Sequence, residues 1–179
     1  MKDTVVHRLY WDFEKEERWL NGMAASGRHL VRYTLGSYHF EVGEPGAWIY
    51  RIELLPSSPG SAKGREYLTF LRDTGIEIVG THLSWAYLRR PAAGGPFELF
   101  SDLDSRIAHY RRVLALFGGL LAALVAAACG LIVTAGDSGG FVLVVPLVLV
   151  VAAGAVLAVQ AVRLARRVRS LTARRQVYE

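Results

Sequence analysis

The sequence LALFGGLLAALVAAACGLIV, residues 114–133, carries no charged side chain, and neither does FVLVVPLVLVVAAGAVLAVQAV, residues 141–162. About 20 apolar residues, each rising about 1.5 Å along a helix, cross the ~30 Å hydrocarbon core of a bilayer. A pair of buried core helices is the alternative, but the rest of a 179-residue chain is too short to bury both. The sequence therefore predicts two transmembrane helices.

The short connection TAGDSGG, residues 134–140, predicts an antiparallel hairpin with both outer ends on one side of the membrane. Those ends carry the basic residues Arg106, Arg111, Arg112, Arg163, Arg166, Arg167 and Arg169. Arginine flanks face the cytoplasm, and the first ten residues lack the apolar segment of a signal peptide. We therefore expect a two-pass protein of the bacterial cell membrane with both termini in the cytoplasm.

These features divide the chain into five predicted segments. They are a cytoplasmic domain at 1–100, a capped helix that enters the membrane at 101–134, an extracytoplasmic loop at 135–140, a second membrane helix at 141–162 and a basic tail at 163–179.

The basic excess of the chain belongs to the membrane flanks. Residues 1–105 carry 12 basic and 14 acidic side chains, whereas residues 106–179 carry nine and two. The sequence pI of about 9.6 thus indicates contact with anionic lipid rather than with nucleic acid. The hydrophobic fraction of 52% excludes a disordered chain, and one cysteine excludes an internal disulfide framework.

Neither span contains an ionisable residue, which favours an anchor over a pump or transporter. Small residues recur every four positions along the first span, at Gly118, Ala122, Ala126 and Gly130. Such rows let helix backbones approach closely in lipid. The row predicts helix packing, either within the hairpin or between hairpins of a self-associating protein.

Hydrophobic periodicity predicts an α+β fold for the first hundred residues. Strands are expected at 4–10, 29–34, 38–42, 48–55, 76–79 and 83–88, and helices at 12–27 and 61–74. Asp12 is the expected N-cap of the first helix, and Gly27 and Gly75 are the expected helix stops. The three central strands resemble an antiparallel meander. We expect a two-layer sandwich of one antiparallel sheet and two helices, with ferredoxin-like topology as the working guess.

Three segments resemble a known family: WDFEKEERWL at 11–20, GEPG at 43–46 followed by YRI at 50–52, and GPFELFSD at 95–102. Over roughly residues 5–112 the chain is similar to the bacterial domain-of-unknown-function 2812 (DUF2812) family. The resemblance implies a C-terminal transmembrane pair and genes near PadR-type transcription regulators. It implies no catalytic residue. Arg28 departs from the aromatic residue expected before His29.

The candidate ligand-binding residues come from the predicted meander. Its polar face would gather Arg32, His39, Glu41, Arg51 and Glu53, either as a binding surface or as cross-strand ion pairs. Trp48 and Tyr50, with Trp85 and Tyr87, line a pocket or fill the sheet core. No histidine has metal-ligand spacing and no phosphate-binding motif occurs, so the sequence predicts no metal, cofactor or catalytic residue.

Three functions fit these patterns. The favoured one is a membrane-anchored cytoplasmic binding or regulatory module, linked to a PadR-type system, with an unidentified protein or small-molecule ligand. The alternatives are a membrane-proximal enzyme acting on a lipid-like or polar substrate, and a membrane-active oligomer or transport accessory. The sequence favours a module without enzymatic activity.

Overall fold

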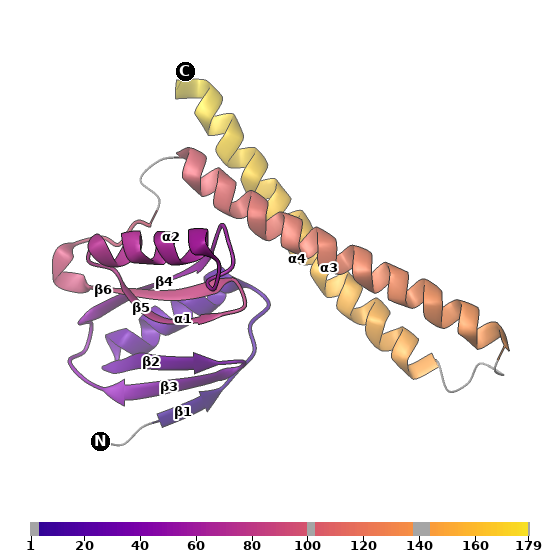
Figure 1. Cartoon of the computed structure of the whole chain (residues 1–179), viewed down its shortest axis with the longest axis horizontal. Coiled ribbons are helices and arrows are strands. Elements are labelled where there is room, and N and C mark those ends of the chain that lie inside the picture. The colour runs from indigo at the N-terminus through magenta and orange to yellow at the C-terminus, as the bar shows by residue number, and fades with distance from the viewer. Residues whose placement is uncertain (1–3, 100–102, 138–143, 179) are drawn as a thin grey trace. The chain divides into compact units, whose positions relative to one another are not determined.

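The computed structural model describes the backbone of residues 4–99, 103–137 and 144–178, and the side chains of 4–99, 104–133 and 144–172. The chain forms two compact units, Met1–Ser101 and Asp102–Glu179. The first is an α+β domain and the second a pair of long helices (Figure 1). The expected class, an α+β domain followed by a helical hairpin, is confirmed.

The α+β domain contains six strands and two α-helices among its described residues. In chain order these are β1 (Thr4–His7), α1 (Phe13–Ala25), β2 (Arg28–Thr34), β3 (Ser37–Val42), β4 (Trp48–Leu54), α2 (Ala62–Asp73), β5 (Glu77–His82) and β6 (Trp85–Pro91), followed by the short 3-10 turn η1 (Ala92–Gly94).

The strands form two antiparallel sheets, with orders β1-β3-β2 and β4-β6-β5. The expected three-strand meander is therefore wrong at its last step, because β4 pairs with β6 and not with β3. Because the strands form two sheets, the expected single sheet with ferredoxin-like topology is also not formed. Alternation shows which side of a strand faces the core, but it does not identify the neighbouring strand.

The two sheets belong to two copies of one structural unit. Each copy runs strand, helix, strand, strand, and in each the third strand lies in the middle of the sheet. Leu30 pairs with Phe40 just before a bulge, and Ile78 pairs with Leu88 just before a second bulge. The same sequence offset leads from Leu30 to Ile78 and from Phe40 to Leu88. The domain is thus an internal repeat, β1-α1-β2-β3 and β4-α2-β5-β6.

Local signals explain where both helices begin and end. The Asp12 carboxylate accepts hydrogen bonds from the backbone N–H groups of Glu14 and Lys15, and Ser61 caps α2 through Gly64 N–H. Gly27 and Gly75 follow the helices with φ of 76° and 81°, a conformation that glycine adopts without strain. The predicted Asp12 cap and both glycine stops are confirmed.

The domain has two apolar cores. Helix α1 buries Leu20 and Ala24 in the first core, against Leu30, Phe40 and Ile52 from both sheets. Helix α2 covers the other face of the second sheet with Leu68 and Leu71. Figure 1 shows α1 between the two sheets and α2 on the outer side of β4-β6-β5. Strand β4 therefore lies between two cores and is buried on both faces.

The C-terminal unit consists of α3 (Leu103–Asp137) and α4 (Val144–Tyr178), which pack along each other. Their apolar parts have a mean hydropathy of 2.5, and only 0% of the most apolar stretch of α3 and 6% of that of α4 are buried. Buried core helices would show the opposite, so these are two candidate membrane-spanning helices. Helix α3 continues beyond the predicted end at residue 134, and α4 includes most of the predicted tail. The sequence also predicts a capping box of Ser101 and Asp104 at the start of α3, but Ser101 lies outside the described residues.

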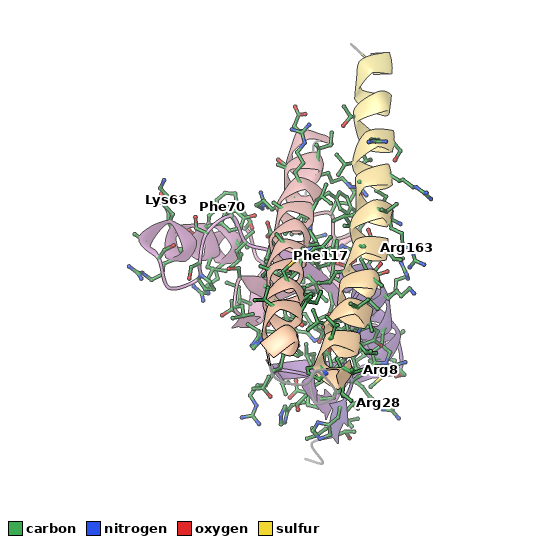
Figure 2. The ribbon with its side chains drawn as sticks, turned by 90° about the vertical axis from the view of Figure 1, so that its right-hand side faces the viewer. Arg8, Arg28, Lys63, Phe70, Phe117 and Arg163 are labelled. Carbon is green, nitrogen blue, oxygen red and sulfur yellow. The ribbon has the colours of Figure 1, made fainter. Side chains whose placement is uncertain are left out.

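The arginine-rich ends of the two helices lie together, as the predicted hairpin requires. Arg167 on α4 donates a hydrogen bond to the hydroxyl of Tyr110 on α3, with 3.4 Å between the atoms. Arg163 is exposed and points away from α3, on which Phe117 is labelled (Figure 2). The remaining flank residues Arg106, Arg111, Arg166 and Arg169 are exposed as well, and Arg112 is half-buried.

The small-residue row lies on the side of α3 that α4 does not cover. Gly118, Ala122, Ala126 and Gly130 are all exposed. Leu121 lies on the covered side, where its Cδ1 is 3.7 Å from the position of a Cβ on Gly154. The structure thus gives the row no packing role within the hairpin, and contact between hairpins remains a prediction.

Candidate functional site

The polar residues expected on one sheet face are divided between two sheets. Arg32, His39 and Glu41 lie in β2 and β3, whereas Arg51 and Glu53 lie in β4 of the other sheet. Arg32 and His39 are cross-strand neighbours, with 3.2 Å between Nη2 and Nδ1. The expected single binding face is therefore not formed, because β4 leaves the meander.

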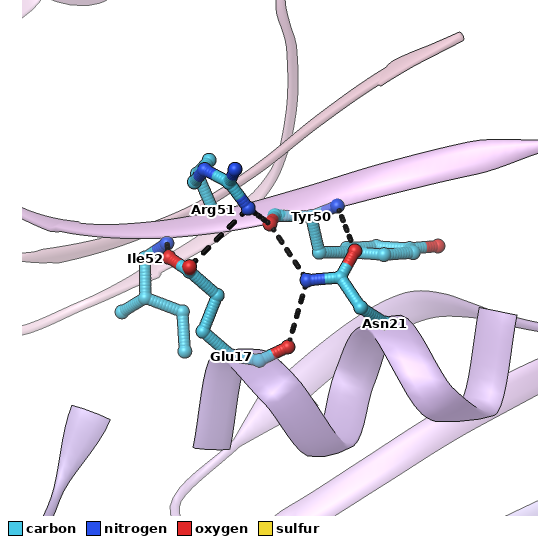
Figure 3. A network of polar contacts seen from close by, with 5 residues as sticks. All are labelled: Glu17, Asn21, Tyr50, Arg51 and Ile52. Atoms are coloured by element: carbon cyan, nitrogen blue, oxygen red, sulfur yellow. Dashed lines mark hydrogen bonds and ion pairs between the residues drawn. The ribbon is translucent and has the colours of Figure 1, made fainter. Parts of the chain in front are cut away.

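Arg51 belongs to a network that joins α1 to the edge of β4 (Figure 3). The Glu17 carboxylate accepts from the Arg51 guanidinium at 3.2 Å and from the Ile52 N–H at 3.1 Å. Asn21 accepts from the Tyr50 N–H at 2.9 Å and donates to the Tyr50 carbonyl at 3.0 Å. These contacts satisfy backbone groups of an edge strand, so Arg51 has a structural role.

Glu53 is fully buried, on the face of β4 turned toward α2. Its two carboxylate oxygens accept from the Tyr67 hydroxyl at 3.0 and 3.2 Å. Trp48 and Tyr50 are also part of the interior: the Arg89 guanidinium lies 4.2 Å from the centre of the Trp48 ring, and Tyr50 is 1% exposed. Trp48 and Tyr50 thus fit the sheet-core alternative better than a pocket lining.

A second buried carboxylate, Glu16, lies where the two repeats meet. Its Oε1 accepts hydrogen bonds from the hydroxyls of Tyr38 and Tyr87, each at 2.6 Å. Tyr38 comes from β3 of the first sheet and Tyr87 from β6 of the second. One oxygen atom of α1 therefore connects both sheets, and only 7% of the Glu16 surface is exposed.

Aromatic rings pack against the two tyrosines that hold this carboxylate. The centre of the Tyr33 ring lies 4.2 Å from that of Tyr87 and 4.9 Å from that of Tyr38, and the centre of the Trp19 ring lies 4.8 Å from that of Tyr38. We call these rings and their half-buried neighbours the aromatic group; its half-buried members are Tyr10, Phe13, Trp19, Tyr33 and Trp85. The exposed Arg8 places its guanidinium 5.2 Å from the centre of the Tyr10 ring and 5.5 Å from that of Trp19.

Burial dominates the electrostatics of Glu16. It raises the pKa of the Glu16 carboxyl above its ordinary value, although the hydrogen bonds from Tyr38 and Tyr87 act in the opposite direction. The pKa values of Tyr38 and Tyr87 are raised as well, first by burial and then by the neighbouring carboxylate. Glu16 forms no ion pair with any residue that the structure describes. The groups that favour its negative charge among the described residues are therefore the Tyr38 and Tyr87 hydroxyls and the N-terminal turn of α1.

From the sequence, Glu16 is one of the acidic residues whose charge is favourable in the first turn of a helix. The signal available was its position four residues before Leu20, which places a carboxylate on the buried stripe of α1. The sequence pattern does not predict that Tyr38 and Tyr87 contact Glu16, because they lie 22 and 71 residues away along the chain.

A comparison with known protein families shows which family the chain belongs to. The model of the family described as "Protein of unknown function (DUF2812)" matches residues 12–122, more than half of the chain. The chain belongs to the DUF2812 family. The matched region of this DUF2812 protein begins at the Asp12 cap and extends into the apolar part of α3. The family resemblance of the three sequence segments is thereby confirmed.

No curated protein and no solved structure matches this DUF2812 chain. Its function is therefore argued from its own residues. Within the described ranges, no three His, Cys, Asp or Glu side chains are placed to hold a metal ion.

Proposed function

We propose that this DUF2812 protein is a membrane-anchored binding module, whose α+β domain takes a small molecule at the junction of its two repeats. The buried carboxylate of Glu16 carries the proposal. Natural domains rarely bury a carboxylate without a cationic partner. Here two hydroxyls from different sheets converge on one oxygen, within a group of aromatic rings. Buried polar groups among aromatic side chains are typical of ligand sites.

The anchor part of the proposal is supported by the two apolar helices and their arginine flanks. Such helices are soluble only in a lipid bilayer, which is the first partner that we propose. Arginines at the shared end favour a cytoplasmic position for that end, and so for the domain and both termini. The exposed small-residue row of α3 supports self-association between hairpins.

The regulatory part of the proposal comes from the family resemblance, which implies PadR-type regulators nearby. A ligand-binding domain at the membrane fits such a setting. The enzyme alternative lacks the single polar face on which it depended, because those residues are divided between two sheets.

Cysteine labelling tests the orientation. In a Cys129→Ala background, Ser138→Cys is expected to react with a membrane-impermeant maleimide on intact cells, because it lies in the connection between the spans. Thr69→Cys, exposed on α2, is expected to react only after permeabilisation. The reverse pattern would show that the domain lies outside the cytoplasm.

Native mass spectrometry of the full chain in lipid nanodiscs tests binding. We expect the wild-type protein to retain a non-lipid small molecule that Glu16→Gln loses, because the variant removes the charge but keeps the hydrogen-bond acceptor. Glu66→Gln, on the exposed side of α2, is the matched control and should retain the molecule. Identical spectra for wild type and Glu16→Gln would contradict the proposal.

A further inference from the structure

The Glu16 site has a definite chemistry, and this inference rests on the binding function proposed above. We infer that the site takes an organic cation, an amine or quaternary ammonium group attached to an apolar body. Glu16 supplies the opposite charge, and the rings of Tyr33, Trp19 and Tyr10 supply π-faces. Three observations carry the inference, from the hydrogen bonds, the rings and the repeat.

The hydrogen bonds fit a charged carboxylate. Both hydroxyl–oxygen distances are 2.6 Å, within the range of about 2.5–2.7 Å that is typical of O–H···O⁻ bonds. Tyr38 and Tyr87 direct their donors at the same oxygen, Oε1. Burying a carboxylate costs free energy, and a positive charge brought close to it offsets that cost. Among the described residues Glu16 has no ion-pair partner, whereas Glu17 in the next position has Arg51.

The rings already hold a cation at their border. The Arg8 guanidinium lies over the faces of Tyr10 and Trp19, at 5.2 and 5.5 Å from their centres. Distances below about 6 Å are those at which a ring face attracts a cation. Trp19 also contacts Tyr38, whose hydroxyl reaches Glu16. The aromatic group that packs against Tyr38 thus already contacts one positive charge, that of Arg8.

The second repeat shows that the fold does not require this group. At the offset that relates the two repeats, Glu16 corresponds to Gly64 and Tyr38 to Ala86, and both are buried at the matching places of α2 and β6. Tyr87 corresponds in the same way to His39, which is on the polar face of β3. At the matching place of the second repeat the same backbone forms without this carboxylate and its two hydroxyls, although that repeat buries another carboxylate, Glu53 of β4, against the Tyr67 hydroxyl. The repeated backbone thus does not itself require the group at Glu16.

Titration of the full chain in nanodiscs with benzyltrimethylammonium tests the inference, with tryptophan fluorescence as the readout since Trp19 and Trp85 lie in the aromatic group. We expect wild-type binding at least ten times stronger than that of Glu16→Gln, and no comparable response to benzyl alcohol or benzenesulfonate. Tyr33→Leu, which keeps both Glu16 hydrogen bonds, should weaken binding several-fold. Glu41→Gln, on the other face of the first sheet, should bind like wild type.

Circular dichroism of each variant checks that it is folded. We expect Glu16→Gln to fold, because it retains a hydrogen-bond acceptor for both tyrosines. Equal affinity of wild type and Glu16→Gln, or a response only to the neutral or anionic probe, would overturn the inference. If the mass spectra show a retained neutral or anionic molecule, the inference of a cationic ligand is wrong but the proposed binding function is supported. If the cation does not bind and no molecule is retained, both the inference and the proposed binding function are wrong.

Discussion

Glu16→Ala is expected to lower the free energy of unfolding of the α+β domain by about 3 kcal/mol, because each buried hydroxyl left without an acceptor costs about 1–3 kcal/mol. The hydroxyls of Tyr38 and Tyr87 both lose their acceptor in this variant. Urea titration of the full chain in detergent micelles measures the change. All four tryptophans lie in residues 1–101, so their fluorescence reports on the domain and not on the helical hairpin.

Glu16→Gln is the control for this experiment, and it separates the hydrogen bonds from the charge. Because burial raises the folded-state pKa of Glu16 above 4.5, the unfolded chain releases this proton at a lower pH than the folded domain does. The wild-type domain therefore loses stability as pH rises from 4.5 through the folded pKa. Gln does not titrate, so the stability of Glu16→Gln relative to wild type should increase over that range.

Glu17 also has a pKa raised by burial, but it is present in both proteins and cancels in the comparison. A relative stability of Glu16→Gln that decreases with pH would show that the folded domain favours the ionised form of Glu16. Equal losses in Glu16→Ala and Glu16→Gln would show that the hydroxyl contacts contribute little.

Gly64→Ala is expected to destabilise the domain by about 2–3 kcal/mol, the usual effect of forcing an extra carbon into a packed interior. Gly64 is buried in the first turn of α2, and a Cβ at this position would overlap the carbonyl oxygen of Ser58. Backbone atoms cannot turn aside as a flexible side chain does. The same urea titration measures the loss.

Gly22→Ala is the matched control, since it makes the same change on α1 where nothing lies within 4 Å of the added carbon. Alanine stabilises an exposed helix interior relative to glycine by up to about 1 kcal/mol. The two substitutions should therefore have opposite signs. A stabilising Gly64→Ala would mean that the segment around Ser58 moves away without cost.

The sequence was most informative where one residue acts locally. Asp12 as a cap, Gly27 and Gly75 as stops, and the apolar length of the two long helices each depend on a few neighbouring positions, and all are confirmed. The α+β class followed from the same periodicities. Strand pairing was not accessible, because the alternation in residues 48–54 fits an edge next to β3 as well as one next to β6.

The repeat and the Glu16 site were missed for a related reason. The two repeats match in backbone but differ in many side chains, as Glu16 against Gly64 and Tyr38 against Ala86 show, and shared residues such as Gly27 and Gly75 do not reveal the repeat by themselves. The site itself is assembled from a helix and two sheets. A charge pattern read along one strand, such as Arg51 and Glu53, gave no information on residues that meet only after the repeats pack.

The contacts of Glu17 and Asn21 with β4 have a consequence for the proposed membrane anchoring, in which many copies would share one bilayer. Confinement to a plane brings neighbouring domains together often, and an open strand edge invites them to join into fibres. Along β4 the amide groups of Tyr50 and Ile52 are already bonded to α1 side chains. A strand from another molecule finds no donor there. At these two positions α1 therefore closes the β4 edge to pairing with another molecule.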